Sequence, residues 1–416
     1  MKLNLARIKA AAYALHASSD EPLCAYLYDL VQLREHAHHL VNSLPNNCEM
    51  FYAIKANSDL PILQTLANEV QGFEVASGGE LAWVREHFPS IPVIFGGPGK
   101  TNQELQAALR HKVEYIHVES FGELERLAWM TQKQQRNVSI LLRINLSLAS
   151  LPKTTLTMGG RPTPFGIDAQ QLPQILDCLK QHPKICLCGF HFHLISHQLD
   201  AEAQLELLRG YFEQVHAWQE KYALGIKHIN VGGGIGINYR EPKKQFDWQR
   251  FSEGLSSLID DCEMGDYQIR FELGRYVTAS SGCYVMEVLD LKENLGQHFA
   301  VARGGTHHFR TPYAQGHSHP FQVLPVESWV YPFSRREIND CAINIVGQLC
   351  TPKDVLVTQA GVKQLRVGDL LLFPYAGAYA WHISHQNFLR HPPPLHHYLQ
   401  AQQQQQLEEL PCAANQ

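Results

Sequence analysis

A chain of 416 residues exceeds one ordinary core, so we expect one large domain and a smaller one. A net charge of −5 without a basic stretch argues against nucleic acid as a partner. No apolar run approaches the roughly 18 residues that cross a bilayer, which argues against a membrane protein. The ten cysteines form no C-x-x-C pair, which favours reduced thiols in the cytoplasm. The chain contains no H-E-x-x-H motif, so no metal site is predicted.

An early strand-like run, LCAYLYDL at 23–30, has no place in the pattern that follows it. From about residue 50 to 275 the chain alternates short β-rich runs with helical patterns whose apolar residues recur every three or four positions. The runs are MFYAIKAN (50–57), GFEVAS (72–77), VIFGGP (93–98), YIHVES (115–120), SILLRIN (139–145), CLCGFHFHL (186–194), HINVGGG (228–234) and IRFELG (269–274). Eight such units predict an α/β fold, a (β/α)8 TIM barrel over residues 31–275, with a doubly wound sheet as the alternative.

Beyond residue 275 the pattern changes to strands joined by turns. Runs such as GCYVMEVLDLKE (282–293) and VGDLLLFPY (367–375) predict a C-terminal antiparallel β domain over residues 276–398. Segment 1–30 could join this domain through its strand. We expect the low-complexity, Gln-rich tail at 399–416 to be disordered.

The stretch FYAIKAN (51–57) places Lys55 at the end of an apolar, aromatic strand. Such a lysine is either an edge residue whose amine reaches water or a desolvated amine with a lowered pKa. The second kind suits Schiff-base chemistry. This stretch alone leaves both interpretations open.

Other reactive side chains also lie at the ends of predicted strands, where barrels of this type carry their chemistry. The run NVGGGIG (230–236) can present backbone N–H groups to a phosphate or can simply form a tight turn. Glu272 and Arg275 could bind a ring nitrogen and a phosphate, or pair with each other. His193 could stack on a ring or be a core histidine. Taken together with Lys55, these features indicate pyridoxal 5′-phosphate (PLP).

The chain resembles the fold-type III PLP enzymes, the family of alanine racemase and of ornithine and diaminopimelate decarboxylases, over roughly residues 20–395. The motifs that carry the resemblance, in chain order, include YAIKAN, GFEVASGGEL, HFHLISHQ, INVGGGIG, ELGRYVTA, GQLCTPKDVL and GDLLLFPYAGAY.

The resemblance implies that Lys55 carries the cofactor as a Schiff base, that His193 stacks on its ring and that Glu272 binds the pyridine nitrogen. The implied cofactor-binding set is Lys55, Glu74, Arg143, His193, Ser196, Gly233, Gly234, Glu272, Arg275 and Tyr379. It also implies a homodimer with shared active sites. In such a dimer Cys350 would reach the site of the partner chain and protonate the carbanion there.

A carboxylate at Glu272 favours decarboxylation, because it keeps the pyridine nitrogen protonated, whereas the similar alanine racemases use arginine there. Thr351 stands where ornithine and diaminopimelate decarboxylases have an acid that binds the distal ammonium. The segments TMGGRPTPFGID, GGTHHFRTPYAQGHSHP and AWHISHQNFLRHP are rich in Arg and His, which suit anionic groups. They resemble the decarboxylases of carboxylate (staphyloferrin-type) siderophore biosynthesis, which act on an amino acid joined to citrate.

The sequence therefore predicts a PLP-dependent L-amino-acid decarboxylase for a citrate-conjugated or otherwise anionic substrate. The predicted substrate-binding residues are Arg161, His307, His308, Arg310 and Thr351. A plain diaminopimelate or ornithine/lysine decarboxylase is one alternative. A racemase of the same fold and a non-catalytic, PLP-binding regulator are the others.

Overall fold

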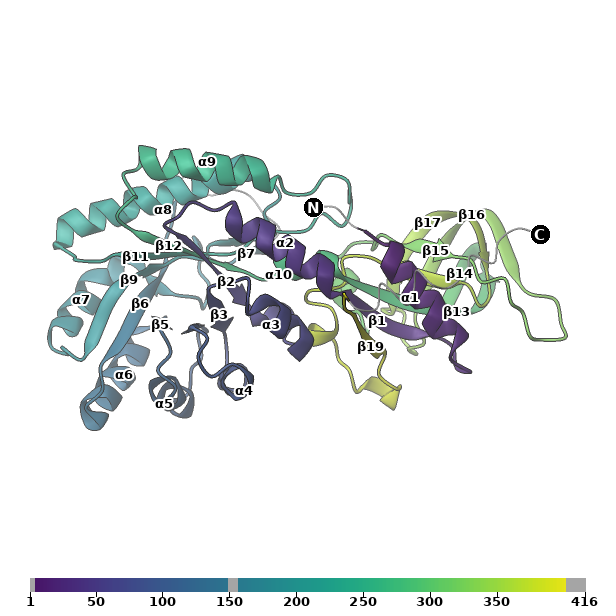
Figure 1. Ribbon diagram of the computed structural model, residues 1–416, viewed down its shortest axis with the longest axis horizontal. Helices are drawn as coiled ribbons and strands as arrows, with labels where there is room; N and C mark the ends of the chain where they lie inside the picture. Colours follow the sequence, from purple (N-terminus) through teal and green to yellow (C-terminus); the bar gives the residue numbers. More distant parts are fainter. Residues whose placement is uncertain (1–3, 149–155, 402–416) are drawn as a thin grey trace.

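The computed structural model describes residues 4–148 and 156–401 (Figure 1). Two lobes lie side by side along the longest axis, the barrel on the left of the figure and the β domain on the right. Of the predicted tail, residues 402–416 lie outside the described residues, and Leu399 is the last residue of a strand.

Eight parallel strands close into a barrel, and they are the eight that the sequence predicted. Neighbouring strands pair in parallel all the way around, and the pairing of β5 with β6 closes the ring. In spatial order the strands are β5 (Tyr115–Val118), β4 (Val93–Phe95), β3 (Gly72–Val75), β2 (Cys48–Ala53), β12 (Gln268–Leu273), β11 (His228–Gly232), β9 (Ile185–His191) and β6 (Val138–Asn145).

Helices cover the outside of the barrel. They are α2 (Leu30–Asn42), α3 (Leu60–Leu66), α4 (Gly78–His87), α5 (Asn102–Arg110), α6 (Phe121–Gln134), α7 (Leu172–Lys180), α8 (Ala201–Tyr222), α9 (Trp248–Asp261) and α10 (Arg275–Thr278). No helix among the described residues is long and apolar enough to cross a membrane.

Serines stop two of the strands and start the helices that follow. Ser77 accepts a hydrogen bond from the Glu80 N–H, and Ser120 accepts one from the Glu123 N–H, both at 3.1 Å. Each serine satisfies a helix N–H that has no partner within its helix. The S-x-x-E spacing thus sets where the chain turns from strand to helix, at the end of the barrel where the predicted site residues lie.

The second lobe is an eight-stranded sheet, and it is mixed rather than antiparallel as predicted. The parallel pairs are β1 with β19 and β14 with β16, and the other neighbours run antiparallel. The strands are β1 (Cys24–Asp29), β13 (Gly282–Asn294), β14 (Gln297–Ala302), β15 (Gln322–Leu324), β16 (Glu337–Val346), β17 (Val355–Arg366), β18 (Leu370–Phe373) and β19 (Leu395–Leu399). Helix α1 (Ala6–Ala17) packs on this sheet, and α11 (Thr311–Gln315) follows β14.

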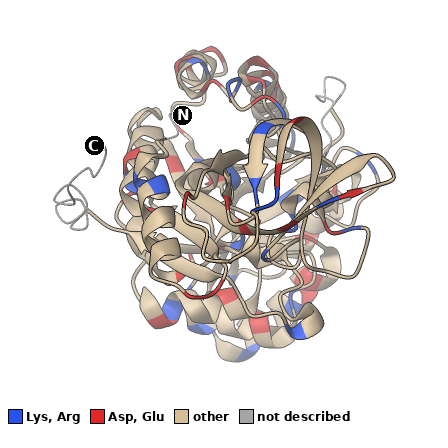
Figure 2. Ribbon diagram, turned by 90° about the vertical axis from the view of Figure 1, so that its right-hand side faces the viewer, with Lys and Arg blue, Asp and Glu red and all other residues tan. Residues whose placement is uncertain are grey.

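One of the two parallel pairs arises because β1 lies between β13 and β19. Ala25 pairs with Val285 on one side and with Leu395 on the other. No turn signal in the sequence predicts the pairing of β19 with β1, because the two strands are hundreds of residues apart in the chain. Figure 2, viewed from this lobe, shows acidic and basic residues interspersed along the chain, which agrees with the small net charge.

Candidate active site

A cavity of about 400 Å³ lies at the carboxyl ends of the barrel strands. Nine of the ten predicted cofactor-binding residues line it, and Gly233 is the exception. They are Lys55, Glu74, Arg143, His193, Ser196, Gly234, Glu272, Arg275 and Tyr379. All but Tyr379 belong to the barrel or its loops; Tyr379 follows β18 and enters from the β domain.

Lys55 forms an ion pair with Glu74, with 2.7 Å between Nζ and Oε2. Of the two interpretations left open for Lys55, the desolvated amine with a lowered pKa is not what the structure shows. The side chain is 43% exposed, because it faces the cavity. Burial acts to lower the pKa of Lys55, but the Glu74 carboxylate outweighs it, so the pKa is raised.

Glu272 lies at the deep end of the cavity and is nearly buried, at 8% exposure. Its Oε1 accepts a hydrogen bond of 2.7 Å from the Asn230 side chain. Among the described residues Glu272 makes no ion pair with Arg275, so the structure does not support that interpretation. Arg275 instead donates to the Tyr239 hydroxyl at 2.8 Å and lies over the Tyr379 ring.

His193 is a neutral ring that joins two parts of the predicted phosphate site. Its Nδ1 accepts from the Gly233 N–H at 3.2 Å, so its proton lies on Nε2, which is 3.3 Å from Ser196 Oγ. Burial, together with the positive charges of Arg143 and Lys55, lowers the pKa of His193 to about 3. The Gly233 N–H is therefore engaged by a side chain, whereas the Ser196 hydroxyl proton stays available to an acceptor.

The glycine turn after β11 brings the chain against its neighbours. A Cβ on Gly233 would lie 2.1 Å from the Glu272 carbonyl oxygen, and one on Gly234 would lie 2.4 Å from that of Ile195. Gly234 also has a positive φ of 97°, which favours glycine. Gly234 thus belongs both to the tight turn and to the cavity wall.

The donors and charges of the cavity fit PLP. A guanidinium and two hydroxyls, from Arg275, Ser196 and Tyr379, line the cavity, which suits a phosphate. The deep end carries the Glu272 carboxylate, which suits a protonated ring nitrogen, and the Lys55 amine opens onto the same space.

Several predicted site residues lie outside this cavity. Cys350 and Thr351 follow β16, and Cys350 is exposed. Arg161 is exposed on the loop after β7 (Leu156–Thr157), and Arg310 is half-buried with its Nη1 3.2 Å from His385 Nδ1.

The prediction that His307 and His308 bind anions needs correction. Both side chains are fully buried in the β domain, and neither lines the cavity. Burial and neighbouring positive groups lower their pKa values, to about 4 for His307 and about 3 for His308. Because both rings are buried and neither lines the cavity, the structure does not place them against a substrate carboxylate.

Sequence analysis missed His117, Asn230 and His197. His197 follows Ser196 and lines the cavity. His117 and Asn230 lie two positions before Glu119 and Gly232 on their strands. Because alternate residues of a strand share a face, this spacing could have placed both inside the barrel.

Comparisons with known proteins agree with this geometry. Residues 30–279 match the family described as "Pyridoxal-dependent decarboxylase, pyridoxal binding domain". The chain belongs to this family of PLP-dependent amino-acid decarboxylases, and PLP is its cofactor.

Two curated relatives cover most of the chain. The 2-[(L-alanin-3-ylcarbamoyl)methyl]-2-hydroxybutanedioate decarboxylase of Staphylococcus aureus is 45% identical over 92% of this chain and 95% of its own length. The L-glutamyl-[BtrI acyl-carrier protein] decarboxylase of Niallia circulans is 30% identical over 89% of this chain and 87% of its own.

A solved structure shares the whole fold. The diaminopimelate decarboxylase of Helicobacter pylori, complexed with L-lysine, superposes with a TM-score of 0.80 at 24% identity and covers 94% of both chains. At this identity the likeness concerns the fold alone.

Proposed function

We propose that this enzyme decarboxylates an L-amino acid whose side chain is joined to citrate, in carboxylate siderophore biosynthesis. The observation that carries the proposal is the 45% identity, over 92% of the chain, to an enzyme named for such a conjugate. In that name an alanine unit is linked through its β-carbon and an amide to 2-hydroxybutanedioate, which together make a citrate amide.

When bound, PLP supplies an electron-poor ring that takes up the electron pair left as the substrate's α-carboxylate departs as CO₂. The chain's own residues hold and orient this group. Lys55 would bond to it, Glu272 would keep a proton on its ring nitrogen, and His193 would stack on its ring. Ser196, Arg275 and Tyr379 would hold its phosphate, together with the turn at Gly234, since the Gly233 N–H is engaged by His193. Glu74 and Arg143 complete the wall.

A loop with fixed backbone contacts borders the cavity through Met158 and Phe165 and carries Arg161. Asn145 accepts from the Gly160 N–H at 2.7 Å and donates to the Arg161 carbonyl at 3.0 Å. The Gly166 N–H donates to Glu119 Oε2 at 3.2 Å. We propose that Arg161 on this loop, together with Arg310, contacts the citrate carboxylates.

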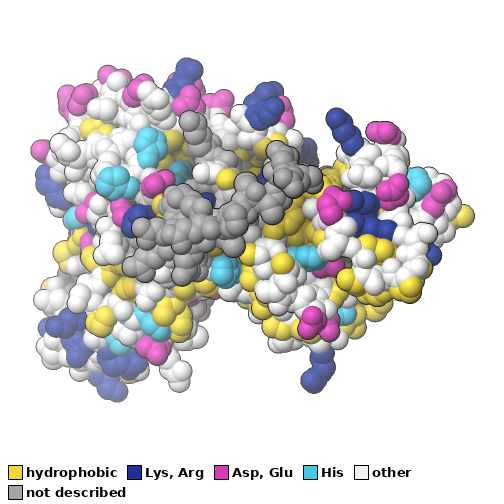
Figure 3. Space-filling view, turned by 45° about the vertical axis from the view of Figure 1, so that its right-hand side comes forward, with side chains coloured by type: hydrophobic (Ala, Val, Ile, Leu, Met, Phe, Trp, Pro, Cys, Tyr) yellow, Lys and Arg dark blue, Asp and Glu magenta, His cyan; other side chains and the backbone are white. Residues whose placement is uncertain are grey.

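We also propose that two chains share each active site. Cys350 and Thr351 lie outside the cavity of their own chain, and Cys350 is exposed, so a second chain could receive them. Thr351 would then leave a distal ammonium without a counter-charge. The β domain also exposes apolar side chains at Val330, Tyr331 and Phe333, and Figure 3 shows hydrophobic side chains gathered on the right-hand lobe.

The test is CO₂ release from a matched set of substrates. The set contains citryl-2,3-diaminopropionate, its acetyl analogue, free 2,3-diaminopropionate, ornithine, lysine and diaminopimelate. We expect kcat/KM for the citryl conjugate to exceed that of the free diamino acids by about a hundredfold or more, because binding sites reject groups that they leave unpaired. The uncharged acetyl analogue separates the effect of conjugation from that of the carboxylates.

Equal kcat/KM values for the citryl conjugate and the free amino acids would overturn the substrate assignment. A change of chirality without CO₂ would indicate a racemase. Arg161→Gln should raise KM for the citryl conjugate and leave KM for the acetyl analogue unchanged.

A further inference from the structure

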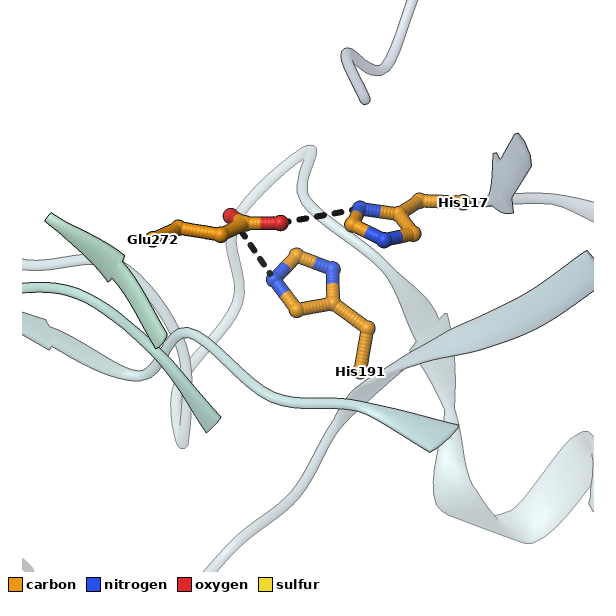
Figure 4. Close-up of side chains that lie close together, drawn as sticks. All are labelled: His117, His191 and Glu272. Carbon is orange, nitrogen blue, oxygen red and sulfur yellow. Dashed lines mark ion pairs between the residues drawn. The ribbon is translucent and has the colours of Figure 1, made fainter. Parts of the chain in front are cut away.

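The Glu272 carboxylate is surrounded by three nitrogen-bearing side chains from three different strands. Asn230 on β11 donates to Oε1 at 2.7 Å. His117 on β5 places Nδ1 3.5 Å from Oε1, and His191 on β9 places Nε2 3.5 Å from Oε2 (Figure 4). The two imidazole rings lie against each other at a tilt of 31°, with 4.1 Å between their centroids.

The backbone fixes which way the Asn230 amide points. The Gly232 N–H donates to Asn230 Oδ1 at 2.9 Å, so the amide nitrogen faces the other way. That nitrogen lies 2.7 Å from Glu272 Oε1 and 3.4 Å from His117 Nε2. Because an amide NH₂ group only donates, His117 Nε2 is an acceptor.

The tautomer of His117 follows from this contact. With Nε2 accepting, the ring proton lies on Nδ1, which points at Glu272 Oε1. His117 Nδ1 and His191 Nε2 have no hydrogen-bond partner in the part of the chain that the structure describes. At 3.5 Å the contacts are long for hydrogen bonds, and the carboxylate is the charged group that these two atoms face.

Both rings are uncharged. His117 and His191 are 0% and 3% exposed, and burial, the positive charges nearby and, for His117, the adjacent His191 hold their pKa values well below the usual range. An imidazolium would cancel the charge of Glu272, whereas a neutral imidazole turns an N–H dipole toward the carboxylate and leaves that charge intact. Donors aimed at a carboxylate favour its ionised form.

His117, His191 and Glu272 have the side-chain types of a metal site, and their possible ligand atoms lie within 4.8 Å of one another. The hydrogen-bond pattern argues against that role. His117 Nδ1 carries the proton that a metal would have to displace, and Nε2 faces the Asn230 amide. The cluster is therefore better explained by what it does to Glu272.

We infer that His117 is a positioning residue that, with Asn230 and His191, holds the Glu272 side chain as an oriented carboxylate at the floor of the cavity. This inference rests on the proposed role of Glu272 beneath the ring nitrogen of PLP. The neutral donors keep the proton on the ring nitrogen rather than on Glu272, and Asn230 links this arrangement to the glycine turn through the Gly232 N–H.

The test compares His117→Phe, which keeps a flat ring and removes the donor, with His117→Asn, which restores an N–H. His228→Phe is the matched control, because His228 contacts Tyr115 elsewhere in the barrel and does not line the cavity. Each variant is loaded with PLP labelled with ¹⁵N in its ring. We expect the ring ¹⁵N signal of His117→Phe to move toward the unprotonated value.

We expect kcat of His117→Phe to fall about ten- to a hundredfold with little change in KM, as for other residues that orient a reacting group. His117→Asn should recover most of both readouts, and His228→Phe should change neither. His191→Phe provides a second variant with the same expected direction if His117→Phe does not fold. An unchanged ¹⁵N signal and kcat in a folded, PLP-loaded His117→Phe or His191→Phe would overturn the inference.

Crystal structures of the cofactor-free wild type and His117→Phe separate this inference from the proposed function. If the wild type releases no CO₂ but Glu272 turns away from Asn230 in the variant, the proposed function fails and the positioning role stands. If the wild type is active, and if in the variant Glu272 keeps its place and the ring ¹⁵N signal of bound PLP is unchanged, only the positioning role fails.

Discussion

The barrel mouth and the β domain contribute to the candidate site in different ways. At the mouth, Lys55, Glu74 and Glu272 each lie at or just beyond a strand end, and a single chain brings them into one cavity. Of its predicted site residues the β domain adds only Tyr379, while Cys350 is exposed and His307 is buried. One chain thus brings together most of the residues predicted to bind the cofactor, whereas the proposed contacts of Cys350 and Thr351 depend on a second chain.

We expect the largest loss of turnover from a substitution at the barrel mouth. Lys55→Ala should lower turnover by at least about a thousandfold, the scale expected when a covalently acting group is lost. Borohydride reduction of the yellow wild-type enzyme should attach PLP to the peptide that contains Lys55, as peptide mapping would check.

Lys100 is the internal control for that experiment. It is another barrel lysine, buried and paired with Glu123 at 2.7 Å, and it should stay unlabelled. Label on Lys100, or a colourless protein that added PLP does not restore, would remove the assignment of Lys55.

The second prediction tests whether the β domain acts on another chain. Cys350→Ala should slow turnover if, as the family resemblance implies, the thiol supplies the proton that replaces CO₂. Mixing this variant with Lys55→Ala should restore about one quarter of wild-type activity, since random pairing makes half of the dimers mixed and each mixed dimer has one intact site.

Cys341→Ala is the matched control, because Cys341 lies on β16 outside the cavity. It should retain full activity on its own. Mixed dimers that form and stay inactive would show that the two residues serve the same chain's cavity.

The smallest effect concerns the buried histidines of the β domain. The pKa of His308 is about 3, because burial and the neighbouring His307 and Arg303 disfavour its charged form. The unfolded chain takes up this proton at higher pH than the folded chain, so stability is lost as the pH falls from about 6.5 toward 3. At pH 5 the loss from His308 is about 2 kcal/mol.

His308→Phe should therefore reduce the difference between the free energies of unfolding at pH 7 and pH 5 by about 2 kcal/mol, as measured by denaturant titration. His111→Phe, at an exposed histidine, serves as the control. If both variants keep the wild-type pH dependence, His308 does not titrate as its burial implies.

The barrel and the β domain also differ in how much of their structure could be predicted from the sequence alone. The positions of Lys55, Glu272 and Arg275 were predictable, because the carboxyl ends of all strands in a parallel barrel lie at the same end of the barrel. The barrel itself followed from eight repeated units. These features depend on patterns of neighbouring residues, and such patterns can be recognised in a single sequence.

The rest depends on contacts between distant segments. The run THHF at 306–309 resembles an anion-binding surface by composition, yet the fold buries His307 and His308 and leaves them neutral. The parallel pairing of β1 with β19 was likewise not predictable, because Ala25 and Leu395 are far apart in the chain. Composition cannot say which histidines are buried.

The position of β1 has a consequence for how the chain folds during synthesis. The barrel strands come from residues 48–273 and can pair as soon as they have been made. Strand β1 is made earlier, but it must wait for β13 on one edge and for β19 on the other. The β lobe therefore stays open until Leu399 has emerged, and such late closure between distant segments is slow and leaves a strand edge unpaired meanwhile.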